Sequence, residues 1–282
     1  MAMMRKAMVL GLLAVMAGWS GCAEGDKTGN NGVAEMPETP AQRLETSNRH
    51  HEWVQVDVGG GQAVTAYLVY PEVSSAADSV VVIHENRGLN DWARSVGDEL
   101  GKHGYVAICP DLLSGTGPSG GNTDSYPDSD AAREGIYKLD PDRVTAALQA
   151  SARHVRELPA TTETVSVMGF CWGGTQAFRL ATNEPSLKLA MVFYGSPPAK
   201  EAMARINCPV FAFYGENDNR INSTIPATTV NMASAAKIYQ SEIYMGSGVG
   251  HGFLRVGMAA DADATAKQAA QDAWTRALGL LQ

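Results

Sequence analysis

The sequence predicts an α/β fold with a mostly parallel central sheet and helices on both of its faces. Apolar runs rich in β-branched residues alternate with segments of helical periodicity along most of the chain, and this alternation is typical of parallel sheets. The clearest unit is residues 164–174, T-V-S-V-M-G-F-C-W-G-G, which indicate a buried strand, a sharp glycine-rich turn and the start of a helix over 175–181. We expect one folded domain over residues 51–282, because about 230 residues suit a single α/β domain.

Residues 1–22 carry the pattern of a secretory signal peptide. Arg5 and Lys6 precede an apolar run over 7–17, and Ser-Gly-Cys at 20–22 closes the segment with small residues. The apolar run is too short for a permanent membrane span. Cys22 stands in the position of the lipidated cysteine of a bacterial lipoprotein. We therefore expect export from the cytoplasm, either to the periplasm or to a membrane through a lipid anchor at Cys22.

The charge balance of the chain is acidic. The formal net charge is -8, and removal of residues 1–21 takes it to -10 because Arg5 and Lys6 are lost. An acidic chain disfavours nucleic acid or anionic lipid as a broad partner, so we expect no nucleic acid partner and no membrane contact other than the anchor. Residues 23–50 are polar and rich in Gly, Pro, Asn and Glu, which predicts a flexible tether.

The folded domain is expected to begin with an antiparallel hairpin, strands 52–58 and 63–70 joined by Gly59-Gly60-Gly61. Further apolar runs ended by Gly, Pro or polar residues predict strands at 79–84, 105–109, 164–170, 188–194, 209–214 and 238–244. Helical patterns predict helices at 91–103, 131–139, 141–158, 175–181, 199–205, 225–235 and 261–281. The Gly-, Ser- and Pro-rich residues 113–130 are expected to form a surface loop near the functional site.

Cys171 is the candidate nucleophile. The motif G-x-C-x-G is the cysteine form of the G-x-S-x-G turn, in which glycines on either side relieve the crowding at a strained corner between strand and helix. We expect Cys171 to be exposed at the sheet edge, with its sulfur near the N-terminus of the next helix, which favours a thiolate. The alternative is that Cys171 is a small buried core residue, as free cysteines often are.

An acid and a base follow later strands of the predicted sheet. Asp218 ends the stretch Y-G-E-N-D after strand 209–214, and His251 lies in the glycine-rich turn after strand 238–244. The carboxyl ends of parallel strands meet at one edge of a sheet, and the order nucleophile, acid, base belongs to the α/β-hydrolase fold. Asp218 orients His251, and His251 takes the thiol proton, in this interpretation. A surface histidine, a helix-capping aspartate and Glu216 as the acid are the alternatives.

Four motifs together resemble the dienelactone hydrolase family of α/β-hydrolases. They are H-E-N-R-G at 84–88, G-F-C-W-G-G at 169–174, Y-G-E-N-D at 214–218 and G-H-G-F at 250–253. The resemblance covers the chain from about residue 54 to the C-terminus and implies the α/β-hydrolase fold. It also implies a carboxymethylenebutenolidase-like enzyme that hydrolyses small esters or lactones.

The resemblance further implies roles for single residues. Glu85 is expected to contact the nucleophile and control its ionisation, and the backbone N–H groups of Trp172 and Asn86 to form the oxyanion hole. Arg255, four residues after the histidine, is in the position that binds the substrate carboxylate in dienelactone hydrolase. Arg87 has two interpretations: an ion pair that organises the Glu85 loop, which we favour, or a substrate contact.

Other chemistries have less support in the sequence. A thioesterase or peptidase could use the same triad, and a non-catalytic binding protein could keep the same fold. No G-x-G-x-x-G follows a strand and no His or Cys cluster has metal-ligand spacing, so neither a dinucleotide cofactor nor a metal is expected. Cys109 and Cys208 are either buried thiols or a disulfide, and we expect a monomer.

Overall fold

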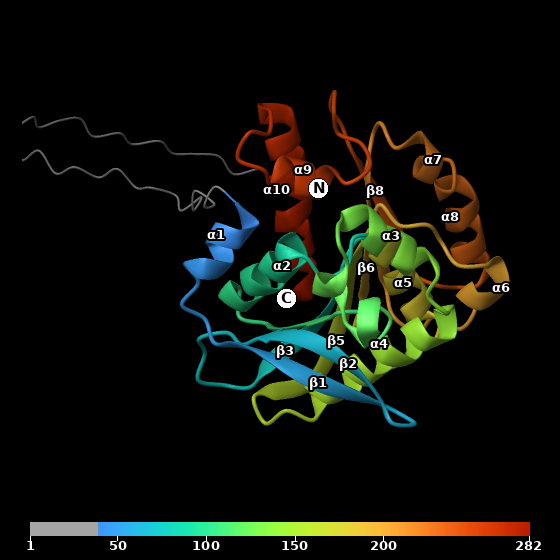
Figure 1. The fold of residues 1–282 in the computed structure, drawn as a ribbon. Helices are drawn as coiled ribbons and strands as arrows, with labels where there is room; N and C mark the ends of the chain where they lie inside the picture. The colour runs from blue at the N-terminus through green and yellow to red at the C-terminus, as the bar shows by residue number, and fades with distance from the viewer. Residues whose placement is uncertain (1–38) are drawn as a thin grey trace, which may run out of the picture. The chain divides into compact units, whose positions relative to one another are not determined.

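The computed structural model describes residues 39–282. The expected signal peptide, Cys22 and most of the expected tether therefore lie outside the described residues. The described helices and strands follow one another as β-strands with helices between them (Figure 1). No helix within residues 39–282 combines the length and the apolar character needed to cross a membrane.

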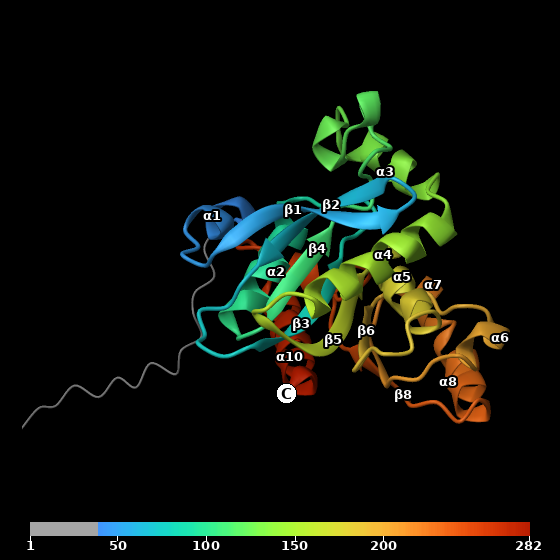
Figure 2. The same ribbon diagram turned by 90° about the horizontal axis from the view of Figure 1, so that it is seen from below.

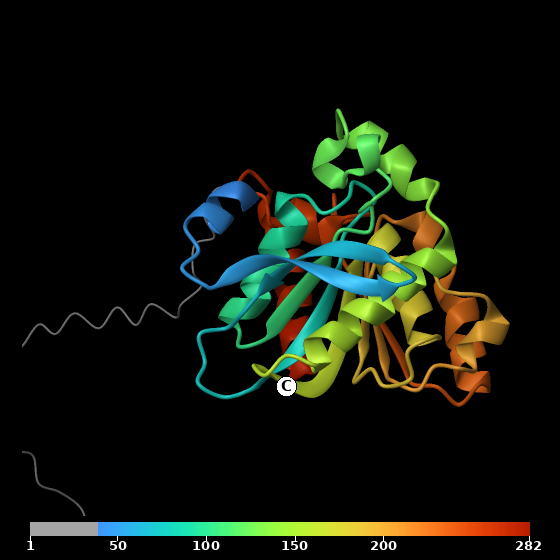
Figure 3. The same cartoon turned by 60° about the horizontal axis from the view of Figure 1, so that its bottom comes forward.

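The strands form a single eight-stranded sheet in the order β1-β2-β4-β3-β5-β6-β7-β8. Its strands are β1 (His51–Gly59), β2 (Gln62–Val69), β3 (Ala77–Ile83), β4 (Val106–Pro110), β5 (Thr161–Phe170), β6 (Ala190–Phe193), β7 (Val210–Gly215) and β8 (Tyr239–Tyr244). The hairpin of β1 and β2 is antiparallel and joins β4 at one edge (Figure 3), whereas the pairs from β4 to β8 are parallel. The predicted α/β class, with a mostly parallel sheet, is confirmed.

Helices cover both faces of the sheet (Figure 2). They are α1 (Pro40–Glu45), α2 (Asp91–Lys102), α3 (Ser129–Tyr137), α4 (Pro141–Arg156), α5 (Trp172–Ala181), α6 (Lys200–Met203), α7 (Asn219–Asn222), α8 (Ile225–Ser234), α9 (Phe253–Gly257) and α10 (Ala264–Leu281). Leu148 of α4 and Phe178 of α5 belong to the core on one face, and Leu100 of α2 and Trp274 of α10 to the core on the other. The predicted helix 261–281 is α10, and the short helix α9 before it was not predicted.

Capping explains where several helices begin. Asn90 precedes α2 and its side chain accepts a hydrogen bond from the Ala93 N–H, while Asp140 precedes α4 and accepts from two backbone N–H groups. Both satisfy donors that have no partner inside the helix. Pro141 stands at the first position of α4, where its missing N–H costs nothing.

The prediction of a flexible tether over residues 23–50 is wrong for residues 39–50. Residues 40–45 form α1, capped by Thr39, and Leu44 packs against the core beside α2. Ser47 Oγ donates to Asp98 Oδ1 at 2.5 Å, and Arg49 Nε donates to the same atom at 2.9 Å. Because Asp98 is almost fully buried, its charge requires such partners, and they fix the segment before β1 to α2.

The segment from Leu113 to Tyr137 projects beside the carboxyl end of the sheet (Figure 2). Its Gly- and Pro-rich part contains two short 3-10 turns, Pro118–Gly120 and Thr123–Ser125, and leads into α3. Thr123 Oγ1 accepts a hydrogen bond from the Leu89 N–H at 2.9 Å. The segment therefore lies against the loop that follows β3, as expected for a loop near the site.

Candidate active site

Cys171 occupies a strained turn between β5 and α5. Its φ is 56° and its ψ is -116°, a conformation that a residue with a side chain rarely adopts. A Cβ added to Gly169 would lie 2.1 Å from the Gly173 carbonyl oxygen, and one added to Gly173 would lie 2.3 Å from the His84 carbonyl oxygen. Only glycine fits at these two positions, because the obstacles are backbone atoms. The glycine spacing seen in the sequence is thus a requirement of the turn that displays Cys171.

His251 bridges Cys171 and Asp218. Its Nε2 lies 3.0 Å from the Cys171 sulfur, and its Nδ1 lies 2.5 Å from Asp218 Oδ2. Asp218 is 6% exposed and precedes α7, where its other oxygen lies 3.4 Å from the Ile221 N–H. The Nδ1–H of His251 donates to the carboxylate in this arrangement, which leaves Nε2 free to accept the thiol proton.

Glu216 does not take part in this chain of contacts. It is exposed, and its carboxylate accepts the Gly246 N–H at 2.7 Å. That hydrogen bond ties the end of β7 to the turn after β8. Of the two acids after β7, Asp218 is therefore the partner of His251.

Two backbone N–H groups act on the Cys171 sulfur. They belong to Trp172 and Asn86, and each lowers the pKa of the thiol. Trp172 begins α5 and Asn86 lies in the loop after β3, so two separate elements converge on one point. An oxygen bound to the attacked carbon beside the sulfur comes within reach of both donors.

The strand end beside the Asn86 loop is held by His84. This histidine is completely buried, its Nε2 accepts the Leu112 N–H at 3.2 Å and its Nδ1 donates to the Glu85 carbonyl at 2.7 Å. Burial lowers the pKa of His84, so the ring is neutral at pH 7. The ring also stacks on Trp172, with ring centroids 5.7 Å apart, which links the loop after β3 to the start of α5.

The segment after β4 holds the other end of the same loop. Thr123 Oγ1, which accepts the Leu89 N–H, donates to Asp111 Oδ1 at 2.7 Å. The Asn86 side-chain amide donates to the Tyr137 hydroxyl at 3.0 Å. The position of the Asn86 N–H thus depends on residues 111–137. Apart from the composition of this loop, the sequence gave no indication that Asp111, Thr123 and Tyr137 make these contacts.

Glu85 is buried beside the nucleophile and has two partners. Arg255 Nε donates to its Oε2 at 2.7 Å, and the Tyr194 hydroxyl donates to its Oε1 at 3.2 Å. The favoured ion pair of Arg87 with Glu85 is therefore wrong. Arg87 is exposed and makes no hydrogen bond or ion pair within the described part of the chain. The cation is instead supplied by α9, which packs near Glu85 in the folded chain.

Tyr194 is a site residue that the sequence did not identify. It follows β6 with a φ of 42°, is completely buried, and its ring meets that of His251 edge to face at 5.2 Å. Burial and the Glu85 charge raise the pKa of Tyr194 well above its ordinary value, so its hydroxyl remains a donor. The available signal was its position, because it stands at the carboxyl end of a parallel strand like Cys171.

Burial and charge keep the Cys171 thiol protonated. Burial raises the pKa of Cys171, the Glu85 carboxylate raises it further, and the two N–H donors and Arg220 only partly offset these effects. The side chain is half-buried rather than exposed. The prediction of an exposed cysteine in the thiolate form is therefore wrong. Burial raises the pKa of the thiol by more than the N–H groups at the helix start lower it.

Arg255 lines the site but is not free for a substrate. Its side chain is about 40% exposed while its Nε is bound to Glu85. Burial lowers the pKa of Arg255, but Glu85, with smaller contributions from Tyr194 and Cys171, raises it by more, so the net shift is upward. The arginine expected to bind a substrate carboxylate is thus held by an internal carboxylate in this structure.

The described residues contain neither a group of side chains that could hold a metal ion nor a disulfide. Within residues 39–282, no three His, Cys, Asp or Glu side chains are grouped so as to hold a metal ion. Cys109 and Cys208 are both free and buried. The disulfide considered for this pair is therefore not formed.

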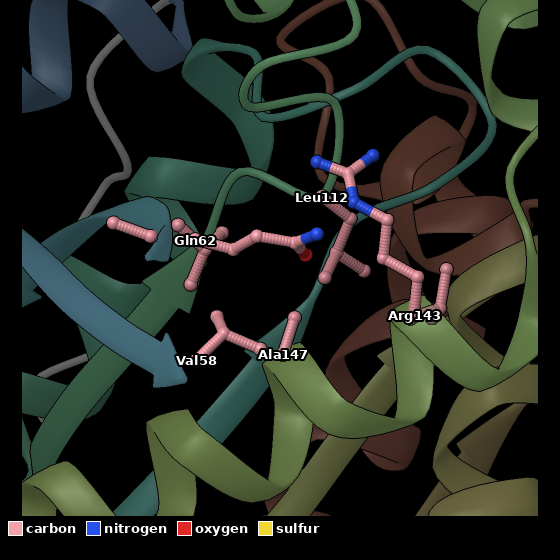
Figure 4. Close-up of a pocket in the computed structure, with 8 residues that line it drawn as sticks. Val58, Gln62, Leu112, Arg143 and Ala147 are labelled. Carbon is pink, nitrogen blue, oxygen red and sulfur yellow. The ribbon is translucent and has the colours of Figure 1, made fainter. Parts of the chain in front are cut away.

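Two cavities of very different size lie away from Cys171. One, beneath the β1–β2 hairpin and bordered by Gln62, Leu112 and Arg143, has a volume of about 10 Å³ (Figure 4), room for about one water. The other, between α1 and the residues after α9, has a volume of about 820 Å³ and is bordered by Arg255. Among the residues described around Cys171, Arg255 alone borders this larger cavity, so the cavity adjoins the site only at that side chain.

Comparison with known proteins identifies one matching family. The model of the family described as "Dienelactone hydrolase family" matches residues 64–282. A Bradyrhizobium protein named "Probable 2-oxo-3-(5-oxofuran-2-ylidene)propanoate lactonase" is 28% identical over 244 residues, which cover 80% of this chain and 92% of that protein. A Yersinia pestis protein named "Putative carboxymethylenebutenolidase" is 28% identical over 236 residues, 77% of this chain and 83% of that protein.

The fold has close counterparts among solved structures. The crystal structure titled "Putative Dienelactone Hydrolase" from Klebsiella pneumoniae superposes with a TM-score of 0.71 at 23% sequence identity, and covers 83% of this chain and 98% of that chain. At this identity the likeness shows the fold. Residues 39–63, which include α1 and β1, lie before the family match.

Proposed function

The chain belongs to the dienelactone hydrolase family, and from this premise we propose that it hydrolyses small esters or lactones with Cys171 as nucleophile. One observation carries the proposal: the His251 ring lies 3.0 Å from the Cys171 sulfur on one side and 2.5 Å from Asp218 on the other. A thiol, a base and an acid in this order support nucleophilic catalysis of acyl transfer.

The first step of the proposed reaction forms a thioester. The sulfur of Cys171 bonds to the carbonyl carbon while its proton passes to His251 Nε2, and the carbonyl oxygen takes up negative charge. When the carbon–oxygen bond of the ester breaks, the proton on His251 passes to the leaving alkoxide. In a lactone the resulting alcohol stays attached to the acyl group.

The second step releases the acid. A water molecule attacks the thioester carbonyl and gives a proton to His251, the carbon–sulfur bond breaks, and the proton returns to the sulfur. The negative oxygen that forms in both steps is stabilised by the N–H groups of Trp172 and Asn86. Loss of one such donor typically costs a factor of about 10² to 10³ in rate.

Glu85 sets the resting state of the nucleophile in this proposal. Its carboxylate raises the pKa of Cys171, which keeps a neutral thiol in the free enzyme, while Arg255 and Tyr194 hold the carboxylate in place. A neutral thiol is less exposed to oxidation than a thiolate. His251 then removes the proton only when a carbonyl is in position.

The test is a panel of p-nitrophenyl esters, lactones and thioesters, with intact-mass detection of an acyl adduct. We expect turnover of esters or lactones, an acyl adduct on Cys171, and loss of both in Cys171→Ala. Hydrolysis that survives in Cys171→Ala, or an adduct on another residue, contradicts the proposed nucleophile. Preferred turnover of thioesters over oxygen esters would change the substrate class but keep the triad.

Export is a separate part of the proposal and rests on residues 1–22. The basic flank, the apolar run and the small residues before Cys22 support it. Expression of the full chain in a bacterial host with cell fractionation tests it, and Cys22→Ser is the matched variant. We expect the chain in the membrane fraction and Cys22→Ser in the soluble periplasmic fraction; recovery of both in the cytoplasm contradicts export.

A further inference from the structure

The peptide group between Glu85 and Asn86 carries one of the two N–H donors of the site. Its N–H belongs to Asn86 and lowers the pKa of the Cys171 thiol, whereas its C=O belongs to Glu85. The backbone just before it lies against the nucleophile turn, since a Cβ added to Gly173 would lie 2.3 Å from the His84 carbonyl oxygen. The described chain contains no cis peptide bond, and in a trans peptide the N–H and the C=O point in opposite directions. The direction of the Glu85 carbonyl therefore determines where the Asn86 N–H points.

His84 holds this carbonyl. Its Nδ1 donates to the Glu85 carbonyl oxygen at 2.7 Å, and among the described residues no other donor reaches that oxygen. Apart from the Asn86 N–H, the remaining hydrogen bonds of Glu85 and Asn86 with the described chain are made by their side chains. A peptide group can turn about the line between its two Cα atoms while both side chains stay in place, because ψ on one side and φ on the other compensate. The His84 hydrogen bond is thus the contact that distinguishes the two orientations of this peptide.

The ring of His84 is itself fixed in one place and one tautomer. The Leu112 N–H donates to its Nε2 at 3.2 Å. A backbone N–H can only donate and a backbone carbonyl can only accept, so Nε2 carries no proton and Nδ1 carries one. The ring is completely buried and stacks on Trp172 with the two planes 15° apart. The neutral ring with its proton on Nδ1 is therefore the form that fits both backbone partners.

We propose that His84 is a positioning residue, which holds the Glu85–Asn86 peptide in the orientation in which its N–H, rather than its C=O, faces the nucleophile. This inference rests on the proposed ester or lactone hydrolysis and assigns one half of the oxyanion hole to a residue outside the triad. Without the Nδ1–H donor the peptide can turn over, and its carbonyl oxygen then repels the negative oxygen that the Asn86 N–H otherwise stabilises. Cys171 and His251 stay in place in that state, so the defect lies in the stabilisation of the oxyanion.

Two substitutions in the full chain separate the two ring nitrogens. In His84→Asn the amide nitrogen lies near the place of Nδ1 and can donate to the Glu85 carbonyl, but no acceptor reaches the Leu112 N–H. In His84→Gln the amide oxygen lies near the place of Nε2 and can accept from Leu112, but the donor to Glu85 is lost. Both remove the ring and its stacking on Trp172, so each variant is the control for the stability loss of the other.

Phenyl trifluoromethyl ketone reports on the oxyanion without turnover. The Cys171 sulfur bonds to its carbonyl carbon, the thiol proton passes to His251 Nε2, and the carbonyl oxygen becomes the negative oxygen of a hemithioketal. Fluorine NMR of the bound probe, followed against pH, gives the pKa at which this oxygen takes up a proton. Donors that stabilise the negative oxygen lower that pKa, so the titration measures the oxyanion hole itself.

We expect His84→Gln to raise the pKa of the hemithioketal oxygen by about two pH units and to lower kcat for esters about 10²-fold, the loss typical of one missing oxyanion donor. KM changes little, because the interaction is made only in the transition state. His84→Asn keeps the donor to Glu85, so we expect its kcat to stay within about tenfold of that of the unmodified chain. Urea denaturation shows similar losses of stability in the two variants.

Three results overturn the inference. They are equal losses of kcat in His84→Gln and His84→Asn, which indicate a purely structural role, an unchanged hemithioketal pKa in His84→Gln, and a His84 ring with its proton on Nε2. The third is read by nitrogen NMR of the isotope-labelled, unmodified chain, so it does not depend on the folding of either variant. A chain that forms the hemithioketal but hydrolyses no ester contradicts the proposed function alone, because the probe reports on the oxyanion hole without turnover.

Discussion

Two cysteines at the carboxyl ends of β4 and β5, parallel strands on either side of β3, have different surroundings. Cys109 is the next-to-last residue of β4 and is completely buried, and a Cβ added to Gly97 of α2 would lie 2.6 Å from its sulfur. Burial raises the pKa of Cys109 far above its ordinary value. It is a packing residue, as free cysteines often are.

Cys171 differs because it lies one residue beyond the end of its strand. β5 stops at Phe170, and the positive φ of Cys171 turns its side chain out of the sheet toward His251 and two backbone N–H groups. Burial raises the pKa of both thiols, so burial does not distinguish them. The turn, and the partners that the side chain reaches from it, separate a candidate nucleophile from a core thiol.

Removal of each sulfur is the strongest test of this difference. We expect Cys171→Ala to lower kcat for ester hydrolysis by up to about 10⁶-fold, which is the loss typical when the nucleophile of a catalytic triad is removed. Cys109→Ala keeps kcat and lowers the free energy of unfolding by about 1 kcal/mol, the cost of a small cavity. Initial rates and urea denaturation give the two quantities, and comparable rate losses in both variants would refute the contrast.

The next test concerns the acid that Cys171 reaches through His251. We expect Asp218→Asn to lower kcat about 10⁴-fold, because an amide cannot hold His251 in the required tautomer. Glu216→Gln is the control after the same strand: it weakens one hydrogen bond to Gly246 and changes kcat by a few-fold at most. Equal losses in the two variants would leave the acid unassigned.

The ionisation of Cys171 provides a smaller, pH-dependent test. Glu85 raises the pKa of Cys171, so Glu85→Gln lowers that pKa and increases the small thiolate fraction present at pH 8. A fall of one pH unit in the pKa increases this fraction about tenfold. The pH profile of iodoacetamide labelling moves to lower pH at Cys171 and stays where it is at Cys109. An unchanged or higher midpoint at Cys171 would show that Glu85 does not act on the thiol.

The smallest expected effect comes from the contact that holds the oxyanion loop. Tyr137→Phe removes the hydroxyl that accepts the Asn86 side-chain hydrogen bond at 3.0 Å. One such bond contributes about 0.5–1.5 kcal/mol, so we expect kcat to fall about two- to tenfold while iodoacetamide labelling of Cys171 is unaffected. Parallel loss of labelling would mean that Tyr137 shapes the turn itself rather than the Asn86 N–H.

Local features of the site could be predicted from the sequence. The glycines around Cys171 follow from backbone clashes between residues a few positions apart, and the strands before Cys171, Asp218 and His251 follow from apolar runs. The sheet and most helices could be predicted to within a few residues, because their apolar patterns are also local. The start of the folded domain could not be predicted, because α1 is short and depends on contacts with α2.

The order of nucleophile, acid and base follows from the sequence, since each lies in the segment after a strand and parallel strands end at one edge of the sheet. Which charged side chains meet at that edge depends on tertiary packing. Arg87 is two residues from Glu85 and points to solvent, whereas Arg255 is 170 residues away and binds it. The physical reason is that a turn depends on the dihedral angles of adjacent residues, while ion pairs, burial and the pKa of Cys171 depend on which distant elements pack together.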